Sequence, residues 1–191
     1  MSNVNIRNAA ADDSVALARF AKHTFLATYQ EQNRPEHIQE YVSHAFSPAT
    51  IGTELHDPAA VFLVAERDSR IIGYTKLREV PAPEGVPQHG AMEMERIYVA
   101  RDYFGHGIGR MLVDAAVAQA VHRNFGFIWL GVWKQNPEAV AFYRKCGFEI
   151  VGSKVFMMGQ DPQEDHVMLL TIKNVYDVGS AGLQRSRKRS H

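Results

Sequence analysis

A strand that leads through a glycine-rich loop into a helix is the feature that most constrains this chain. The segment from Met92 to Gly109 reads MEMERIYVARDYFGHGIG. Glycines at 105, 107 and 109 let backbone amides approach an anion closely, and the positive end of a helix starting near Ile108 adds to the attraction. The segment predicts a loop that binds an anionic group such as a phosphate, although similar patterns occur in turns that bind nothing.

Two common phosphate motifs do not fit this loop. The dinucleotide-binding fingerprint needs a third glycine where Arg110 stands. The P-loop needs Gly-Lys-Ser/Thr, which is absent here. The loop therefore matches neither motif and carries only a shorter glycine pattern.

A second segment, from Ile128 to Phe148, reads IWLGVWKQNPEAVAFYRKCGF. A strand is followed by Asn136, Pro137 and Glu138, which supply a helix N-cap, a preset first-turn φ and a favourable first-turn charge. The helix that follows carries an apolar stripe with helical spacing and ends at Gly147: Ala139, Phe142, Tyr143 and Cys146. Tyr143 is the one hydroxyl on that stripe.

Together these segments resemble the GNAT-type N-acetyltransferases, whose signature is a strand, a Gln/Arg-x-x-Gly-x-Gly/Ala pyrophosphate loop and a later Asn…Phe-Tyr…Gly-Phe stretch. Phe104 stands where the family usually has Gln or Arg. The resemblance covers roughly residues 4 to 173. Three phrases are similar to the PaiA branch, the bacterial polyamine acetyltransferases: His23-Thr24-Phe25…Tyr29…Gln32-Asn33…Pro35-Glu36, Glu95-Arg96-Ile97-Tyr98-Val99 and Ile128-Trp129-Leu130-Gly131-Val132-Trp133.

The resemblance implies an α/β (α+β) GNAT fold with a mixed, mostly antiparallel sheet of about seven strands flanked by helices. In the family the fourth and fifth strands splay apart, and the pantetheine arm of CoA lies between them. We expect one GNAT domain over residues 1–175 and a basic, disordered tail over 176–191. Propensity and spacing predict strands over 4–7, 60–66, 71–78, 92–99, 128–133, 149–158 and 166–173, and helices over 12–29, 35–46 and 108–125, with a short one after Ser47 and another from Pro137.

The expected activity is transfer of an acetyl group from acetyl-CoA to a primary amine, by direct attack in a ternary complex. The resemblance favours a polyamine such as spermidine or spermine. Residues expected to hold the cosubstrate are Ile97, Tyr98, Val99, Phe104, Gly105, His106, Gly107, Ile108, Gly109, Arg110, Asn136, Tyr143 and Lys145. Residues expected to hold the amine are Phe25, Tyr29, Asn33, Tyr41 and Glu93.

The chemistry suggests two catalytic residues. An alkylamine has a pKa of about 10.4, so it must lose a proton before it attacks, and Glu95 is the candidate base or amine-binding group. Strand alternation predicts that Glu93, Glu95, Ile97 and Val99 share one face. Tyr143 is the candidate acid for the leaving thiolate, particularly if the site lowers its pKa. The alternatives are a solvated or salt-bridged carboxylate for Glu95 and an ordinary core tyrosine for Tyr143.

Two other functions stay open at this point. One is the same chemistry on an amino acid, an antibiotic or a protein N-terminus. The other is a CoA-binding regulatory protein without turnover.

Composition indicates which partners and which cellular compartment to expect. The chain of 191 residues has 21 Lys and Arg against 21 Asp and Glu, so no net field recruits nucleic acid or a membrane surface. The single cysteine and the absence of a signal-peptide core suit a cytoplasmic protein. The histidines show no spacing that demands a metal. We expect no metal, no nucleic acid and no membrane, a small-molecule amine as partner, and a homodimer as in many relatives.

Overall fold

The computed structural model describes residues 3–172 and contains one seven-stranded sheet. The strand order is β1-β2-β3-β4-β5-β7-β6, and every neighbouring pair is antiparallel except β4 and β5. This is the expected mixed α/β fold. The strands are β1 (Asn5–Asn8), β2 (Ala60–Arg67), β3 (Arg70–Arg78), β4 (Ala91–Val99), β5 (Phe127–Trp133), β6 (Glu149–Met158) and β7 (Asp161–Thr171). The basic tail predicted over 176–191 lies outside the described residues.

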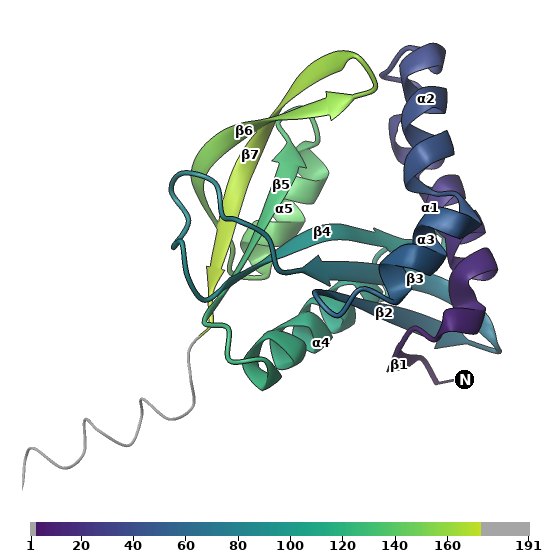
Figure 1. Cartoon of the computed structure of the whole chain (residues 1–191), viewed down its shortest axis with the longest axis horizontal. Helices are drawn as coiled ribbons and strands as arrows, with labels where there is room; N and C mark the ends of the chain where they lie inside the picture. The colour runs from purple at the N-terminus through teal and green to yellow at the C-terminus, as the bar shows by residue number, and fades with distance from the viewer. Residues whose placement is uncertain (1–2, 173–191) are drawn as a thin grey trace, which may run out of the picture.

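The helices cover the two faces of the sheet and enclose two apolar cores. The helices are α1 (Ser14–Tyr29), α2 (Pro35–Ala45), α3 (Pro48–Leu55), α4 (Ile108–His122) and α5 (Pro137–Lys145), with short 3₁₀ turns at Ala11–Asp13 and Arg101–Tyr103. Helices α1, α2 and α3 pack on Phe62, Val64 and Tyr74. Helices α4 and α5 pack on the opposite face, around Met92, Met94 and Ile128. Figure 1 shows α1–α3 gathered on one side of the strands and α4 on the other.

Strands β4 and β5 stay together over only three residue pairs. Ala91, Met92 and Glu93 lie opposite Phe127, Ile128 and Trp129, and no pairing joins the two strands beyond that point. In Figure 1, β5, β6 and β7 turn away from β4 and carry α5 with them. The edge of β4 that follows Glu93 therefore has no strand beside it on the β5 side. The splay expected from the resemblance is present.

A β-bulge interrupts β4 at Glu95. Lys76 of β3 lies opposite Arg96, but the next residue, Leu77, lies opposite Met94, so Glu95 is the extra residue. Glu95 and Arg96 consequently both line the same pocket, whereas Ile97 packs against the α4 core. The prediction that Glu93, Glu95, Ile97 and Val99 share one face was wrong, because the bulge shifts the alternation by one residue.

The boundaries of one strand and one helix also differ from the prediction. Strand β7 begins at Asp161 rather than at residue 166, because Gly159, with φ of +60°, turns the chain within two residues and Met158 pairs with Asp161. Helix α4 ends at His122 rather than at residue 125, and Asn124 follows with φ of +64°. The first change places Asp165 in a strand.

Candidate active site

The glycine loop before α4 presents open backbone donors. Gly105 and Gly107 have φ of +78° and +80°, which glycine adopts without strain. The first amides of α4 have no acceptor among residues 3–172, and the N-cap residue Gly107 offers no side chain. An added Cβ at Gly105 or Gly107 would meet nothing within 4 Å, so the space in front of the loop is free. Free amides at a helix N-terminus suit a phosphate.

Gly109 has a different role, because it allows α4 to approach α5 closely. A Cβ at this position would lie 3.0 and 3.2 Å from two ring atoms of Phe142. The close contact fixes the pyrophosphate-type loop against the helix that carries Tyr143. Phe104 and His106 stay exposed, and the His106 ring nitrogen Nδ1 contacts the Phe104 carbonyl oxygen at 3.0 Å.

The two expected basic neighbours of this loop lie at the surface. Arg110 Nε donates to Asp114 Oδ1 at 2.8 Å, one turn along α4, and Lys145 is exposed near the end of α5. Asn136 caps α5 as predicted, since its Oδ1 accepts from the Ala139 amide at 3.1 Å. A contact of these three side chains with CoA stays a prediction.

Tyr143 is buried in the α4 core, with 9% of its surface exposed. Its ring lies edge-on to Phe148 at 5.7 Å between centroids. Burial, and then the neighbouring Tyr29, raise the pKa of the Tyr143 phenol well above its ordinary value. The site therefore does not provide the lowered pKa that would have made Tyr143 a stronger acid. The hydroxyl is protonated at neutral pH.

A pocket of about 150 Å³ occupies the splay between β4 and β5. Its walls come from α1, α2 and five of the strands, which are far apart in the sequence. Its lining combines aromatic rings with charged groups. The lining residues are Phe25, Tyr29, Tyr41, Arg78, Glu93, Glu95, Arg96, Tyr98, Gly131, Trp133, Lys154, Phe156, Met158, Gln163 and Asp165.

The predicted amine-binding residues mostly meet in this pocket. Phe25 belongs to the hydrophobic core and also lines the pocket. It is 3% exposed and its ring stacks on Tyr41 at 5.0 Å between centroids. Tyr29 lies edge-on to Trp133 at 6.2 Å. Asn33 does not line the pocket. Its Nδ2 donates to the Tyr29 carbonyl at 2.9 Å and its Oδ1 accepts from Gln163, so it ties the end of α1 to β7.

Two of the pocket carboxylates are neutralised by buried or half-buried cations. Glu93, 2% exposed, accepts from Arg78 Nε at 2.7 Å and from Lys154 Nζ at 3.2 Å. Glu95 Oε2 lies 2.6 Å from the buried Lys76 Nζ. Burial alone would raise the pKa of Glu95, but Arg96, Lys76 and Arg78 together outweigh it and lower the pKa. Such a carboxylate stays ionised and accepts a proton weakly, which favours binding over base catalysis.

The third pocket carboxylate, Asp165, was not identified from the sequence. It lies on β7, 7% exposed, opposite Lys154 of β6 and Trp133 of β5. Gly131 makes room for it, because a Cβ there would lie 2.9 Å from Asp165 Oδ2 and 3.1 Å from Lys154 Nζ. Burial raises the pKa of Asp165 to about 6, although Lys154 opposes the shift. A glycine inside the apolar strand IWLGVW was the available signal of a close approach.

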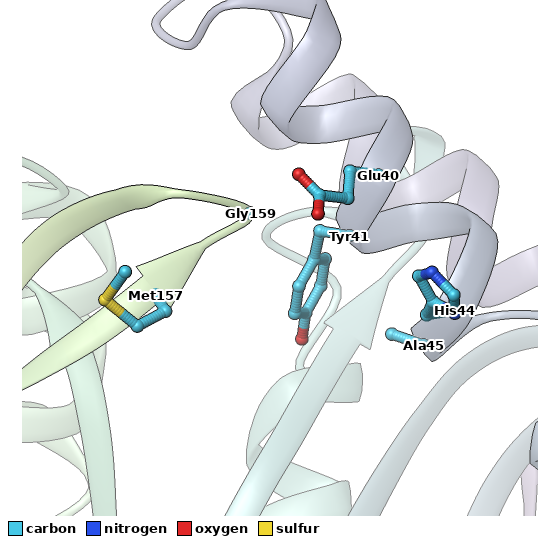
Figure 2. A pocket seen from close by; sticks show the side chains of 6 residues that line it. All are labelled: Glu40, Tyr41, His44, Ala45, Met157 and Gly159. Carbon is cyan, nitrogen blue, oxygen red and sulfur yellow. The ribbon is translucent and has the colours of Figure 1, made fainter.

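A second, open space of about 390 Å³ lies between α2 and the β6–β7 turn. Figure 2 shows Glu40, Tyr41 and His44 on α2 facing Met157 and Gly159 across the gap. Tyr41 lines both spaces. The second space therefore adjoins the pocket in the splay.

Within residues 3–172 no three His, Cys, Asp or Glu side chains form a group suited to a metal ion. No helix of the described chain is long and apolar enough to cross a membrane. Burial raises the pKa of the Cys146 thiol, so the thiol form is favoured.

Comparison with known proteins decides the family. The model of the acetyltransferase (GNAT) family matches residues 17–148. The chain belongs to the GNAT family. An uncharacterized N-acetyltransferase of Mycobacterium tuberculosis is 32% identical over 157 residues, which are 82% of this chain and 96% of that protein.

Solved structures share the fold of this GNAT protein. The PaiA N-acetyltransferase from Thermoplasma acidophilum, solved with coenzyme A, has a TM-score of 0.75 at 22% identity and covers 88% of this chain and 99% of its own. The spermidine/spermine N-acetyltransferase SpeG from Vibrio cholerae has a TM-score of 0.60 at 24% identity, with coverage of 88% and 95%. The family establishes an enzyme that transfers an acetyl group from acetyl-CoA to an amine.

The raised pKa of Asp165 gives a stability prediction. The folded state binds this proton more tightly than the unfolded state, whose pKa is near 3.8, so the ionised carboxylate destabilises the fold above pH 6. We expect Asp165→Asn to stabilise the protein by about 2 kcal/mol at pH 8 and by almost nothing at pH 4. Chemical denaturation at both pH values measures this difference.

Glu164→Gln is the matched control, because Glu164 is the exposed neighbour on the same strand. We expect it to change the unfolding free energy little at either pH. An equal gain from Asp165→Asn at pH 4 and pH 8 would contradict the account of a buried, ionised carboxylate.

Proposed function

We propose that this acetyltransferase acetylates a polyamine such as spermidine or spermine, by direct attack of the amine on acetyl-CoA in a ternary complex. The observation that carries the proposal is the aromatic pocket in the splay between β4 and β5, with a carboxylate at its wall and an open space beside it. The names of the PaiA and SpeG structures support the same substrate class.

The size of the pocket supports a narrow acceptor. Its volume of about 150 Å³ is below the roughly 300–1,000 Å³ of sites that enclose a whole drug-sized ligand. One aliphatic arm that ends in an amine suits such a space. Aromatic rings such as Tyr29 and Trp133 offer packing for the stem and cation–π contacts for the ammonium.

The adjoining space gives the rest of a long acceptor somewhere to lie. It shares Tyr41 with the pocket and carries the carboxylate of Glu40 at its rim. A second ammonium of the same molecule is attracted by that carboxylate, whereas a short monoamine has no group to place there.

Roles for the site residues follow from their positions. The free amides of the glycine loop hold the pyrophosphate of CoA, and the unpaired edge of β4 around Ile97 pairs with the pantetheine arm like an added strand. Backbone N–H groups of that edge polarise the thioester carbonyl. Tyr143 protonates the leaving thiolate, and the ionised Glu95 attracts the amine.

A second candidate is an acceptor that carries its own carboxylate, such as an amino acid. Arg78 and Lys154 favour it, because both side chains line the pocket and are partly exposed. Both cations already pair with Glu93, which leaves less charge for a ligand. The polyamine is therefore the first choice.

A thiol-release assay with acetyl-CoA and a panel of amines tests the substrate class. The panel contains spermidine, spermine, a monoamine of similar length, several amino acids and a peptide with a free N-terminus. We expect the highest kcat/KM for the polyamines and a lower value for the monoamine, because it lacks the distal ammonium. Highest activity on amino acids or the peptide would move the assignment to that class.

Tyr143→Phe tests the acid role. We expect kcat to fall by about 10²-fold, with little change in acetyl-CoA affinity, because the variant loses only the proton donor. Steady-state kinetics and calorimetric titration with acetyl-CoA measure the two quantities.

Tyr74→Phe is the matched control, since Tyr74 is buried and its hydroxyl has no hydrogen-bond partner in the described chain. It should keep its kcat. An unchanged kcat in Tyr143→Phe would remove Tyr143 from the acid role.

A further inference from the structure

Asp165 is the pocket carboxylate with no cation of its own. Glu93 pairs with Arg78 and Lys154, and Glu95 pairs with Lys76. No salt bridge or hydrogen bond reaches the Asp165 side chain from within residues 3–172, although 93% of the residue's surface is covered. Burying a carboxylate without a cationic partner costs free energy of folding, so we expect its presence to serve a function.

The surroundings hold Asp165 toward the pocket. It lies between Lys154 of β6 and Trp133 of β5, and the space above Gly131 holds both Asp165 Oδ2 and the end of the Lys154 side chain. Lys154 does not neutralise it, since the Lys154 ammonium is 3.2 Å from Glu93 Oε1 and 4.9 Å from the centre of the Trp129 ring. Asp165 lines the pocket, so a cationic group bound there can pair with its carboxylate.

The other charged and titratable groups around Asp165 do not compete for that role. From β6, Lys154 is a cation, and from α1, Tyr29 faces it with a phenol whose pKa burial raises. From β4, Glu93 is already paired with Arg78 and Lys154. On its own strand, Glu164 is exposed and pairs with Lys134 at 2.8 Å.

We propose that Asp165 is the base that binds the acceptor ammonium and removes its proton before acetyl transfer. This inference rests on the proposed acceptor pocket. One proton of the ammonium passes to an Asp165 oxygen, and the neutral nitrogen then attacks the thioester carbonyl. The C–N bond forms and the C–S bond breaks. The nitrogen loses a second proton as the amide forms, and this proton passes through water to the Tyr143 phenolate that is left when Tyr143 protonates the thiolate. Asp165 later returns its own proton to water.

The geometry distinguishes Asp165 from Glu95, the base suggested by the sequence. Three cations hold Glu95 in its ionised form, so protonating it disrupts a network. Protonating Asp165 disrupts no ion pair and relieves the burial of a charge. Its pKa of about 6 also lies closer to neutral pH. A base with such a pKa is mostly ionised at pH 7 and still accepts a proton readily.

The test is the pH dependence of kcat/KM for spermidine, or for the panel amine that the wild-type chain acetylates fastest. We expect the wild-type value to rise up to about pH 6 and then to stay level to about pH 9. For Asp165→Asn we expect a loss of about 10²-fold at pH 7 and a tenfold rise per pH unit from 7 to 9, because only free amine then reacts.

Two further variants complete the test. Glu164→Gln should reproduce the wild-type profile. Asp165→Glu keeps a carboxylate, so it should keep a level region at a reduced height, and calorimetric titration with acetyl-CoA checks that each variant is folded. A wild-type profile in Asp165→Asn, or a steadily rising profile in Asp165→Glu, overturns the proposal. A wild-type chain that acetylates no amine overturns the proposed function instead.

Discussion

The separation of β4 from β5 is the constraint on which the rest of the site depends. Two parallel strands that pair at Glu93 and Trp129 and then part leave a row of backbone groups without partners. Buried backbone donors and acceptors are costly when unpaired, so this edge needs a ligand or water beside it. The same gap opens the pocket to the edge of β4. In the proposed function, the acetyl-CoA site and the amine site are therefore two sides of one separation rather than two independent features.

The charges in this gap fall into two kinds. Glu93 and Glu95 are held by Arg78, Lys154 and Lys76, so they shape the pocket and add little net negative charge. Buried pairs of this type contribute little net stability, although removing one partner is costly. Asp165 is different, since it is buried without a partner. Its burial weakens the fold at neutral pH and leaves one group able to take a proton from a bound amine.

The sequence predicted the elements that local signals define. The glycine loop, the Asn136 cap and the strand–helix order are confirmed, because positive φ, capping and apolar periodicity act over a few residues. The bulge at Glu95 was missed, because it depends on the register with β3. Asp165 was placed in a turn, because Pro162 and three polar residues hide a strand whose pairing is decided by the tight turn at Gly159. The family resemblance supplied part of the pocket, such as Tyr29 and Tyr41, but the walls from β6 and β7 were missed because only the fold brings these segments together.

Initial-rate kinetics with both substrates varied test most directly whether the two sites form one reaction centre. If acetyl-CoA and the amine meet across the splay and react directly, double-reciprocal plots at several amine concentrations will intersect. The half-buried Cys146, whose thiol pKa is raised, is then no carrier of the acetyl group. Parallel lines, together with an acetylated protein formed from acetyl-CoA in the absence of amine, would contradict the account.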